Sequence, residues 1–290
     1  MPRTKLCVAH LNINSLRHKL DEVSKVLHDF EIDVFGLSET KLDYDVDDAE
    51  LTIPCYRLFR KDRNKSGGGV AMYVSSRLHV QRFCDPDRDD IEAFWLKLFL
   101  RREVYRIGVV YRPRSEFVDY WNKLCFSWDA LSPTNTIIIG DFNANPLNPS
   151  DLAWKHLNFI SVSYGLKNCI RVPTRITPSS HSCLDLLFTN IDPLPTCDAV
   201  ETHISDHKMV VGSLKVCSVR IPTQRSNLTF SEDFRKFSLS NFTQQLQQNG
   251  INTFSSTDDV DDMWAEWHLK FVSTLDNCVP LKSRREGKKN

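Results

Sequence analysis

The chain has 290 residues, a length that allows one large domain with an appendage, or two domains. Hydrophobic residues make up 41% and charged residues 26%, fractions that exclude a largely disordered or membrane-embedded protein. Lysine plus arginine and aspartate plus glutamate both number 37, so a contact with nucleic acid requires a local basic patch rather than a strong overall charge. Nine cysteines without a Cys-x-x-Cys pair argue against a zinc site or a disulfide framework, and together with the lack of a recognisable signal peptide or bilayer-spanning apolar run they favour an intracellular protein.

The first elements predict a strand–helix–strand unit. Residues 6–11 form an apolar run typical of a buried strand, which ends at Asn12. Apolar residues then recur every three or four positions over 16–30, as in an amphipathic helix. A second strand, 32–37, ends just before Glu39. A unit of this length implies a right-handed crossover, with the two strands parallel and both polar ends at one edge of the sheet.

The next part of the chain predicts an antiparallel meander. Turn-rich segments separate short strands and no strong helix intervenes. Gly67 to Gly69 favours a hairpin turn over a phosphate loop, because no Lys-Ser/Thr ending and no helix follow it. The basic residues of 57–65 favour a solvated loop slightly over a DNA-backbone contact. The four predicted strands are residues 56–59, 69–74, 94–99 and 104–110.

A helix with an aromatic stripe over 117–128 precedes the buried strand 137–139, which runs into Gly140, Asp141 and Asn143. A carboxylate and an amide at the tip of a buried strand need compensation by a metal ion, a phosphate or a polarised water. Glycine, aspartate and asparagine are also the usual turn residues, so this segment alone is equally consistent with a turn and with a site.

Later elements bring further polar residues to strand ends. A helix is expected from about residue 150, and residues 182–188 form a short apolar strand that contains Asp185. Asp206 and His207 precede a last strand over 209–214. A carboxylate inside an apolar strand needs a partner, so Asp185 is the hardest of these residues to explain as ordinary structure.

The sequence changes character after about residue 217. We expect a catalytic domain over 1–218, followed over 219–290 by a linker and a helical connector. The expected helices lie near 234–248 and 258–275, and the basic tail, 282–290, is expected to be loosely ordered.

Polar side chains therefore stand at the ends of the predicted strands or in the loops beside them. If the strands form one layered sheet system with their tips together, these groups converge. Taken singly, each can be explained as a turn or a satisfied structural residue, and it is their convergence that indicates a site. They are Asn12, Glu39, Tyr111, Asp141, Asn143, Asp185, Asp206 and His207.

A divalent cation would remove the repulsion among converging carboxylates. Oxygen ligands with no cysteine and a single histidine suit Mg²⁺, with Mn²⁺ as the alternative, better than zinc. We expect Glu39 to be the main ligand, with Asn12 and Asp206 near it.

His207 can donate a hydrogen bond to a scissile phosphate or move a proton, and Asp185 is the candidate to hold its imidazole in one tautomer. Asp141 can orient or deprotonate the attacking water, with Asn143 aligning that water.

Six short motifs follow one another along the chain. They are Leu11-Asn12-Ile13-Asn14-Ser15-Leu16, Ser38-Glu39-Thr40, Tyr111-Arg112-Pro113, Gly140-Asp141-Phe142-Asn143, Ser182-x-x-Asp185 and Ser205-Asp206-His207. In this order and spacing they resemble the exonuclease–endonuclease–phosphatase superfamily, which includes apurinic endonucleases and pancreatic deoxyribonuclease. Over residues 5–216 the sequence most resembles the endonuclease domain of non-LTR (LINE-type) retrotransposons.

The resemblance implies an α/β fold, a four-layer α/β sandwich in which two mixed β-sheets pack face to face with helices outside, plus a helical C-terminal extension. It implies that Glu39 binds the metal with support from Asn12 and Asp206, and that Tyr111 contacts the scissile phosphate. One departure is visible, since Ser15 stands where many relatives carry glycine.

The resemblance also implies that Asp141 and Asn143 position or activate water, and that the Asp185–His207 pair stabilises the phosphoryl transition state. Which of His207 and Asp141 is the general base stays open. The residues expected to contact the substrate are Ser182, Arg112 and Arg175.

The function implied is that of a Mg²⁺-dependent endonuclease that nicks one strand of double-stranded DNA, leaves a 3′-hydroxyl and contacts the DNA backbone. No membrane contact is expected; the protein would be intracellular, and nuclear when acting on genomic DNA. A reverse transcriptase domain is expected downstream in a full-length element, and this chain carries none. Two alternatives stay open: a phosphoesterase of the same fold acting on abasic DNA or a small phosphoester, and a catalytically decayed nucleic-acid-binding relic.

Overall fold

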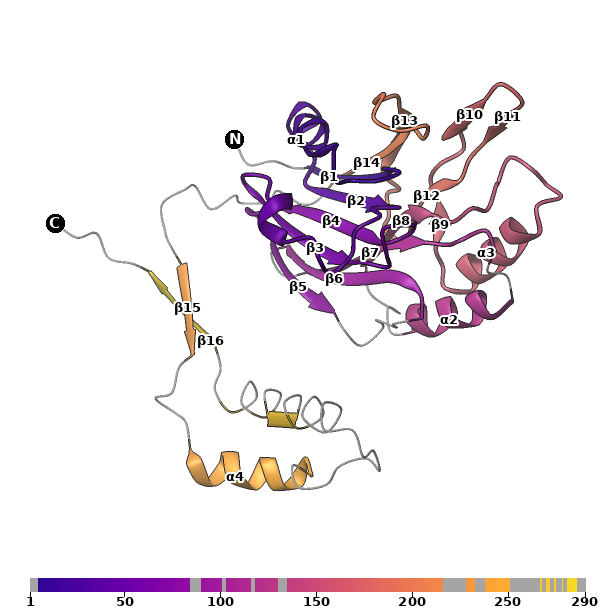
Figure 1. Ribbon diagram of the computed structural model, residues 1–290. Helices are drawn as coiled ribbons and strands as arrows, with labels where there is room; N and C mark the ends of the chain where they lie inside the picture. The colour runs from indigo at the N-terminus through magenta and orange to yellow at the C-terminus, as the bar shows by residue number, and fades with distance from the viewer. Residues whose placement is uncertain are drawn as a thin grey trace. The chain divides into compact units, whose positions relative to one another are not determined.

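The computed structural model contains two compact units, Met1–Ile221 and Pro222–Asn290, which are described separately (Figure 1). It describes residues 5–83, 90–100, 103–115, 118–129, 135–215, 228–232, 238–250, 267, 270–271, 274, 278 and 281–285.

One six-stranded sheet of the first unit contains the first strand of the chain. β1 (Lys5–Asn12) and β2 (Val34–Ser38) are parallel and α1 (Leu20–Asp29) joins them, which confirms the predicted strand–helix–strand unit. The strand order is β13-β14-β1-β2-β4-β3, and every other pair is antiparallel. The remaining elements are the 3₁₀ helix η1 (Asp48–Leu51), β3 (Tyr56–Lys61), β4 (Val70–Ser75), β13 (Thr196–Val200) and β14 (Met209–Lys215).

The second six-stranded sheet is also mixed, with the order β5-β6-β7-β8-β12-β9. Its parallel pair is β7 (Glu103–Tyr111) and β8 (Asn135–Asp141), and α2 (Val118–Asp129) lies between them in the chain. The other elements are β5 (His79–Phe83), β6 (Glu92–Leu100), α3 (Leu152–Ser163), β9 (Lys167–Asn168) and β12 (Asp185–Thr189).

The strands predicted as one antiparallel meander are divided between the two sheets. β3 and β4 pair in the first sheet, whereas β6 and β7 pair in the second, next to β5. Periodicity marks a strand but not its partner, so it could not place the crossing between β4 and β5. A further two-stranded hairpin, β10 (Arg175–Thr177) and β11 (Ser180–Ser182), precedes β12 in the chain. Asp185 is the first residue of β12 instead of lying inside a strand.

The layers follow from two apolar cores. The larger core lies between the sheets and continues under α2 and α3, while a second core packs α1 against the first sheet (Figure 1). Gly36 of β2 allows the sheets to approach, since a Cβ there would lie 2.7 Å from Cδ1 of Ile139 on β8. The described helices and sheets thus form the predicted α/β sandwich. The carboxyl ends of β1 and β2 in one sheet and of β7 and β8 in the other lie together at one side of it.

The second unit contains α4 (Leu239–Gln248), whose Phe242 ring packs edge-on against Phe271, and an antiparallel pair, β15 (Leu228–Glu232) and β16 (Leu281–Arg285). The described part of the predicted helix 258–275 is helical, whereas β16 occupies part of the tail expected to be loosely ordered. Among the described residues, no helix has both the length and the apolar character needed to cross a membrane.

Candidate functional site

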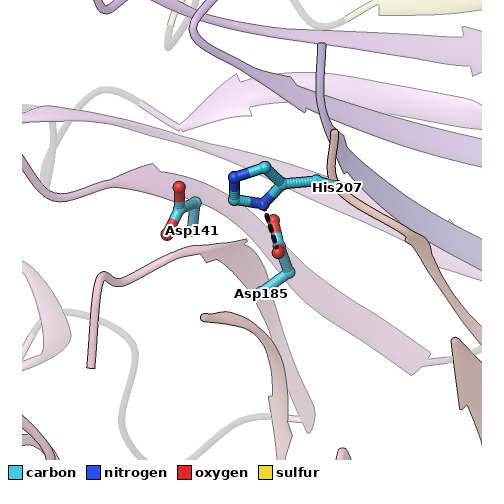
Figure 2. A group of neighbouring side chains, drawn as sticks. All are labelled: Asp141, Asp185 and His207. Carbon is cyan, nitrogen blue, oxygen red and sulfur yellow. Dashed lines mark hydrogen bonds and ion pairs between the residues drawn. The ribbon is translucent and has the colours of Figure 1, made fainter. Parts of the chain in front are cut away.

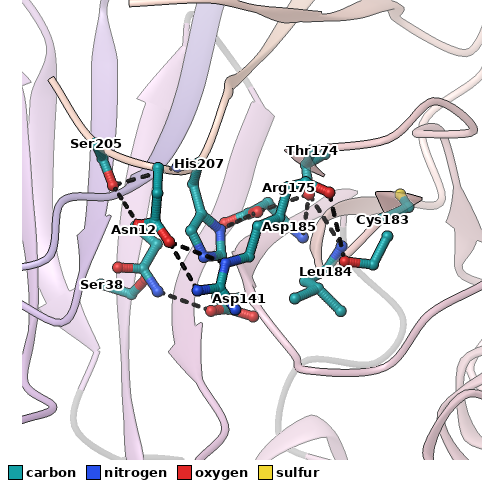
Figure 3. A network of polar contacts seen from close by, with 12 residues as sticks. Asn12, Ser38, Asp141, Thr174, Arg175, Cys183, Leu184, Asp185, Ser205 and His207 are labelled. Atoms are coloured by element: carbon teal, nitrogen blue, oxygen red, sulfur yellow. Dashed lines mark hydrogen bonds and ion pairs between the residues drawn. The ribbon is translucent and has the colours of Figure 1, made fainter. Parts of the chain in front are cut away.

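The polar residues predicted to converge do so around one pocket of about 260 Å³ in the first unit. They come from the ends of β1, β2, β7 and β8, from the start of β12 and from the segment before β14. Figure 3 shows Asn12, Asp141, Asp185 and His207 close together in one network of polar contacts. The residues that line the pocket are Asn12, Asn14, Glu39, Tyr111, Arg114, Asp141, Asn143, Arg175, Asp206 and His207.

Glu39 directly follows β2, with a φ of 51°. Its Oε1 accepts hydrogen bonds from Nδ2 of Asn12, at 2.9 Å, and from the hydroxyl of Tyr111, at 3.1 Å. Asn12 Nδ2 also donates to Oδ2 of Asp141, at 2.8 Å. Burial, and then the nearby charge of Glu39, raise the pKa of Tyr111, so its hydroxyl stays protonated and remains a donor. These contacts tie the ends of four strands, β1, β2, β7 and β8, into one unit.

The Asp141–Asn143 segment turns sharply after β8. Asn143 has a φ of 46°, and its backbone N–H donates to Oδ1 of Asp141 at 2.9 Å. Gly140 lies so close to the carbonyl oxygen of Val110 on β7 that a Cβ would collide with it. The turn and the site, which the sequence left as alternatives, are therefore the same structure.

Arg112 holds this turn from behind. Its guanidinium donates to the carbonyl oxygen of Phe142 at 2.6 Å and to that of Asn143 at 2.7 Å, and it packs over the ring of Trp121. The side chain is 2% exposed and does not line the pocket. The structure thus places Arg112 as a support of the Asp141 turn, away from the position expected of a substrate-binding residue.

Asp185 and His207 form a buried pair, of which His207 lines the pocket. Oδ2 of Asp185 lies 2.7 Å from Nδ1 of His207 and accepts a hydrogen bond from the hydroxyl of Thr174, also at 2.7 Å. Figure 2 shows the imidazole between the carboxylates of Asp185 and Asp141. The Nδ1 contact fixes the ring and leaves its other nitrogen for the pocket.

The charges of this group depend on one another. Burial lowers the pKa of His207, but Asp185 and then Asp141 outweigh that effect and raise it to about 9. Burial also opposes ionisation of Asp185, yet His207 and His10 hold the pKa of that carboxyl below its usual range. Burial, together with Asp185, raises the pKa of Asp141 to about 6. At neutral pH the pair is therefore an imidazolium and a carboxylate, and Asp141 is ionised and can accept a proton.

Asp206 and Arg175 form an ion pair at the mouth of the pocket. Nε and Nη2 of Arg175 lie 3.0 Å and 2.7 Å from Oδ2 of Asp206. Burial raises the pKa of Asp206, but Arg175 outweighs it, so the pKa is lowered. Ser182, in contrast, does not line the pocket, and its hydroxyl lies 3.5 Å from the carbonyl oxygen of Arg175 in the β10–β11 hairpin.

Four residues at the site were missed in the sequence. Thr174 binds Asp185, Arg114 donates to Oδ1 of Asn143 at 2.8 Å, and Asn14 lines the pocket. His10 is fully buried, with Nδ1 3.4 Å from Oδ1 of Asp185. Only His10 left a signal, because it is a polar residue inside an apolar strand, two positions before Asn12.

The residues of the pocket fit a hard divalent cation. Glu39, Asp141 and Asp206 bring three carboxylates to its lining, and Asn12 adds an amide. Oε2 of Glu39 accepts no hydrogen bond from the part of the chain that the structure describes, because both donors bind Oε1. Asp141, Asp185 and His207 could also hold an ion, but the contact between Asp185 and His207 already neutralises that pair. Glu39, with Asn12 and Asp206, is the better candidate.

Comparisons with known proteins bear on the family and on the fold. The model of the Endonuclease/Exonuclease/phosphatase family matches residues 9–207. No curated protein matches the chain.

Solved structures with the same fold include nucleases. The endonuclease domain of TRAS1, a telomere-specific non-LTR retrotransposon, is 16% identical, with a TM-score of 0.61 over 75% of this chain and 100% of that one. An AP endonuclease from Archaeoglobus fulgidus is 17% identical, with a TM-score of 0.55 over 71% and 98%. The 3′ phosphatase NExo from Neisseria, bound to product DNA hairpin, is 17% identical, with a TM-score of 0.57 over 71% and 98%.

Proposed function

The chain belongs to the endonuclease/exonuclease/phosphatase family, and we propose that it is a Mg²⁺-dependent endonuclease that hydrolyses a DNA phosphodiester, nicks one strand and leaves a 3′-hydroxyl. The observation that carries this proposal is the arrangement of the pocket. Glu39, with Asn12 and Tyr111, lines the pocket together with Asp141 and with His207, whose Nδ1 is held by Asp185 behind it. A phosphodiester needs charge compensation, a proton acceptor and a hydrogen-bond donor, and these groups supply all three.

Asp141 is proposed to accept the proton of the attacking water, with Asn143 aligning that water. This role is supported by the position of Asp141 between Asn12 and the Asn143 backbone, which fix both of its oxygens. His207, held through Nδ1 by Asp185, is proposed to donate from its other nitrogen to a phosphoryl oxygen. Tyr111, which stays protonated, is proposed to donate to the same phosphate.

The metal would be held by Glu39, with Asn12 and Asp206 near it, and would supply positive charge against the phosphoryl oxygens as the transition state develops. Mn²⁺ could replace Mg²⁺ at such an oxygen-rich site. Arg175 already pairs with Asp206. A bound cation would therefore compete with Arg175 for Asp206, and the substrate phosphate would compete with Asp206 for Arg175.

DNA is favoured as the substrate by two features. Arg114 and Arg175 place cationic side chains in the lining of the pocket, where phosphates adjacent to the scissile one would lie. Three of the similar structures are described as a retrotransposon endonuclease, an AP endonuclease and a 3′ phosphatase bound to a DNA product. We further propose that residues 1–218 act as the catalytic domain, that 219–290 connect it to a reverse transcriptase in a longer element, and that the protein acts in the nucleus.

The test is nicking of supercoiled plasmid in Mg²⁺ by the wild type, Glu39→Ala and His207→Ala, with the exposed Glu50→Ala as the matched control. Loss of a metal ligand or of the proton-handling histidine should reduce the rate by about 10²–10⁴-fold, whereas Glu50→Ala should act as the wild type does. The proposal would be refuted if the wild type failed to nick the plasmid, or if Glu39→Ala and His207→Ala both nicked it as fast as the wild type.

Two further measurements identify the product end and the class of substrate. Extension of the nicked product by a DNA polymerase without phosphatase treatment detects the 3′-hydroxyl. Cleavage of an abasic duplex, or of a small phosphoester, without nicking of intact plasmid would assign the protein to the alternative phosphoesterase class.

A further inference from the structure

A second buried histidine approaches the Asp185–His207 pair from the first strand. Alternate residues of a strand point to opposite faces. Val8 of β1 belongs to the core between the sheets, whereas Ala9 and Leu11 belong to the core under α1. His10 shares the face of Val8 and is 0% exposed, so an imidazole occupies a place in the apolar space between the sheets. Such a group costs free energy unless its partners compensate it, so the partners indicate its role.

The two ring nitrogens of His10 face different parts of the site. Nε2 lies 3.2 Å from the hydroxyl oxygen of Ser38, the residue before Glu39. Nδ1 lies 3.4 Å from Oδ1 of Asp185, without the alignment of a hydrogen bond, and among the described residues neither atom has a hydrogen-bond partner. If the hydroxyl of Ser38 donates to Nε2, the ring proton of His10 lies on Nδ1. A small rotation of the Asp185 carboxylate then allows Nδ1 to donate a hydrogen bond to Oδ1.

The other oxygen of that carboxylate is already saturated. Oδ2 of Asp185 takes the hydroxyl of Thr174 and Nδ1 of His207, both at 2.7 Å, which leaves His10 as the group that faces Oδ1. We propose that His10 is a positioning residue of the proposed hydrolysis. After a small rotation of the carboxylate, Nδ1 of His10 donates to Oδ1 of Asp185, which fixes the plane of the carboxylate and thereby the orientation of His207. This inference rests on the proposed function, because His10 does not line the pocket and acts through Asp185.

The experiment compares His10→Leu, which removes both ring nitrogens, with His10→Asn, whose amide keeps a donor near the position of Nδ1. Val8→Ala, on the same strand and face, is the matched control for damage to the core. Steady-state nicking in Mg²⁺ gives kcat and KM, and thermal unfolding gives the stability of each variant. Groups that orient a reactive residue from behind typically contribute about 10–100-fold. We expect His10→Leu to lose kcat by that factor with KM within about twofold, and His10→Asn to recover most of it.

A second readout does not depend on activity. In the metal-free, ¹⁵N-labelled full chain, the proton on Nδ1 of His207 should give a strongly deshielded resonance because of its 2.7 Å contact with Asp185. His10→Leu should shift or broaden this resonance, and His10→Asn and Val8→Ala should preserve it.

Several results would overturn the inference: an unchanged kcat and an unchanged His207 resonance in His10→Leu, a loss of kcat in Val8→Ala equal to that in His10→Leu, or a His10→Asn variant as impaired as His10→Leu. A wild type that does not nick DNA refutes the proposed function instead. In that case the resonance of His207 still decides whether His10 positions Asp185.

Discussion

Replacement of Thr174 by valine should destabilise the protein and impair the site together. Thr174 is 0% exposed, and its hydroxyl donates to Oδ2 of Asp185 at 2.7 Å. The hydroxyl oxygen of Thr174 also accepts hydrogen bonds from the backbone N–H of Leu184, at 2.9 Å, and from that of Asp185, at 3.1 Å. Valine has the shape of threonine but cannot make any of these three contacts, so the change removes polar contacts without leaving a cavity.

The magnitude follows from the three lost contacts. A hydrogen bond to a charged group contributes about 1.5–3 kcal/mol, and each buried N–H left without an acceptor costs about 1–3 kcal/mol. The backbone of Leu184 and Asp185 can relax toward water in part, and this reduces the total cost of the lost contacts. We therefore expect the free energy of unfolding to fall by about 3–6 kcal/mol. Thr174→Ser keeps the hydroxyl and should lose less than about 1.5 kcal/mol, mainly for the missing methyl group.

Chemical denaturation at pH 7 measures both variants, and kcat at a temperature where each is folded measures the site. A Thr174→Val protein within about 1 kcal/mol of the wild type would show that these contacts do not hold the Asp185 carboxylate. Equal losses in the valine and serine variants would likewise refute the reasoning, because they would assign the effect to the methyl group and not to the hydroxyl.

Three other changes test separate features. Ser15 has a φ of 84°, so Ser15→Gly should raise the free energy of unfolding by about 0.5–1 kcal/mol, and an unchanged or lower melting temperature would contradict this. Arg112→Met removes the donors that hold the Asp141 turn, so kcat should fall at least about 10-fold with KM nearly unchanged, whereas a raised KM alone would restore Arg112 as a substrate contact. The pKa of His207 is raised to about 9 from an ordinary value of 6.5, so its stabilising effect is complete below pH 6.5 and is lost as pH rises through 9. Denaturation of the metal-free protein should show this decline, and His207→Asn should lack it.

The sequence predicted the parts of the site that follow from local order. β1, α1 and β2 form the expected crossover, so Asn12 and Glu39 lie at one edge of a sheet and share a hydrogen bond. Asp185 and His207 were paired by their chemical needs, since a buried carboxylate and a phosphate-facing imidazole each require a partner. Their contact at 2.7 Å agrees with that expectation.

Other features depend on contacts between distant segments and left little trace in the sequence. Arg112 follows Tyr111 directly, yet its long side chain turns away from the pocket to the carbonyl oxygens behind the Asp141 turn. Thr174 reaches Asp185 because the β10–β11 hairpin between them folds the chain back. Strand periodicity likewise could not show that β3–β4 and β6–β7 belong to different sheets, because an alternating pattern is the same whichever sheet a strand joins.

The place of β14 in the first sheet determines when this protein can acquire its site during synthesis. β14 lies between β13 and β1, and Lys5 pairs with Lys215, so one side of the first strand has no partner until nearly the whole first unit has left the ribosome. His207, two residues before β14, arrives at the same moment. Pairing of such distant segments is slow and favours late, concerted closure. A nascent chain should therefore keep an exposed edge of β1 and an incomplete site until the last strand of this unit inserts.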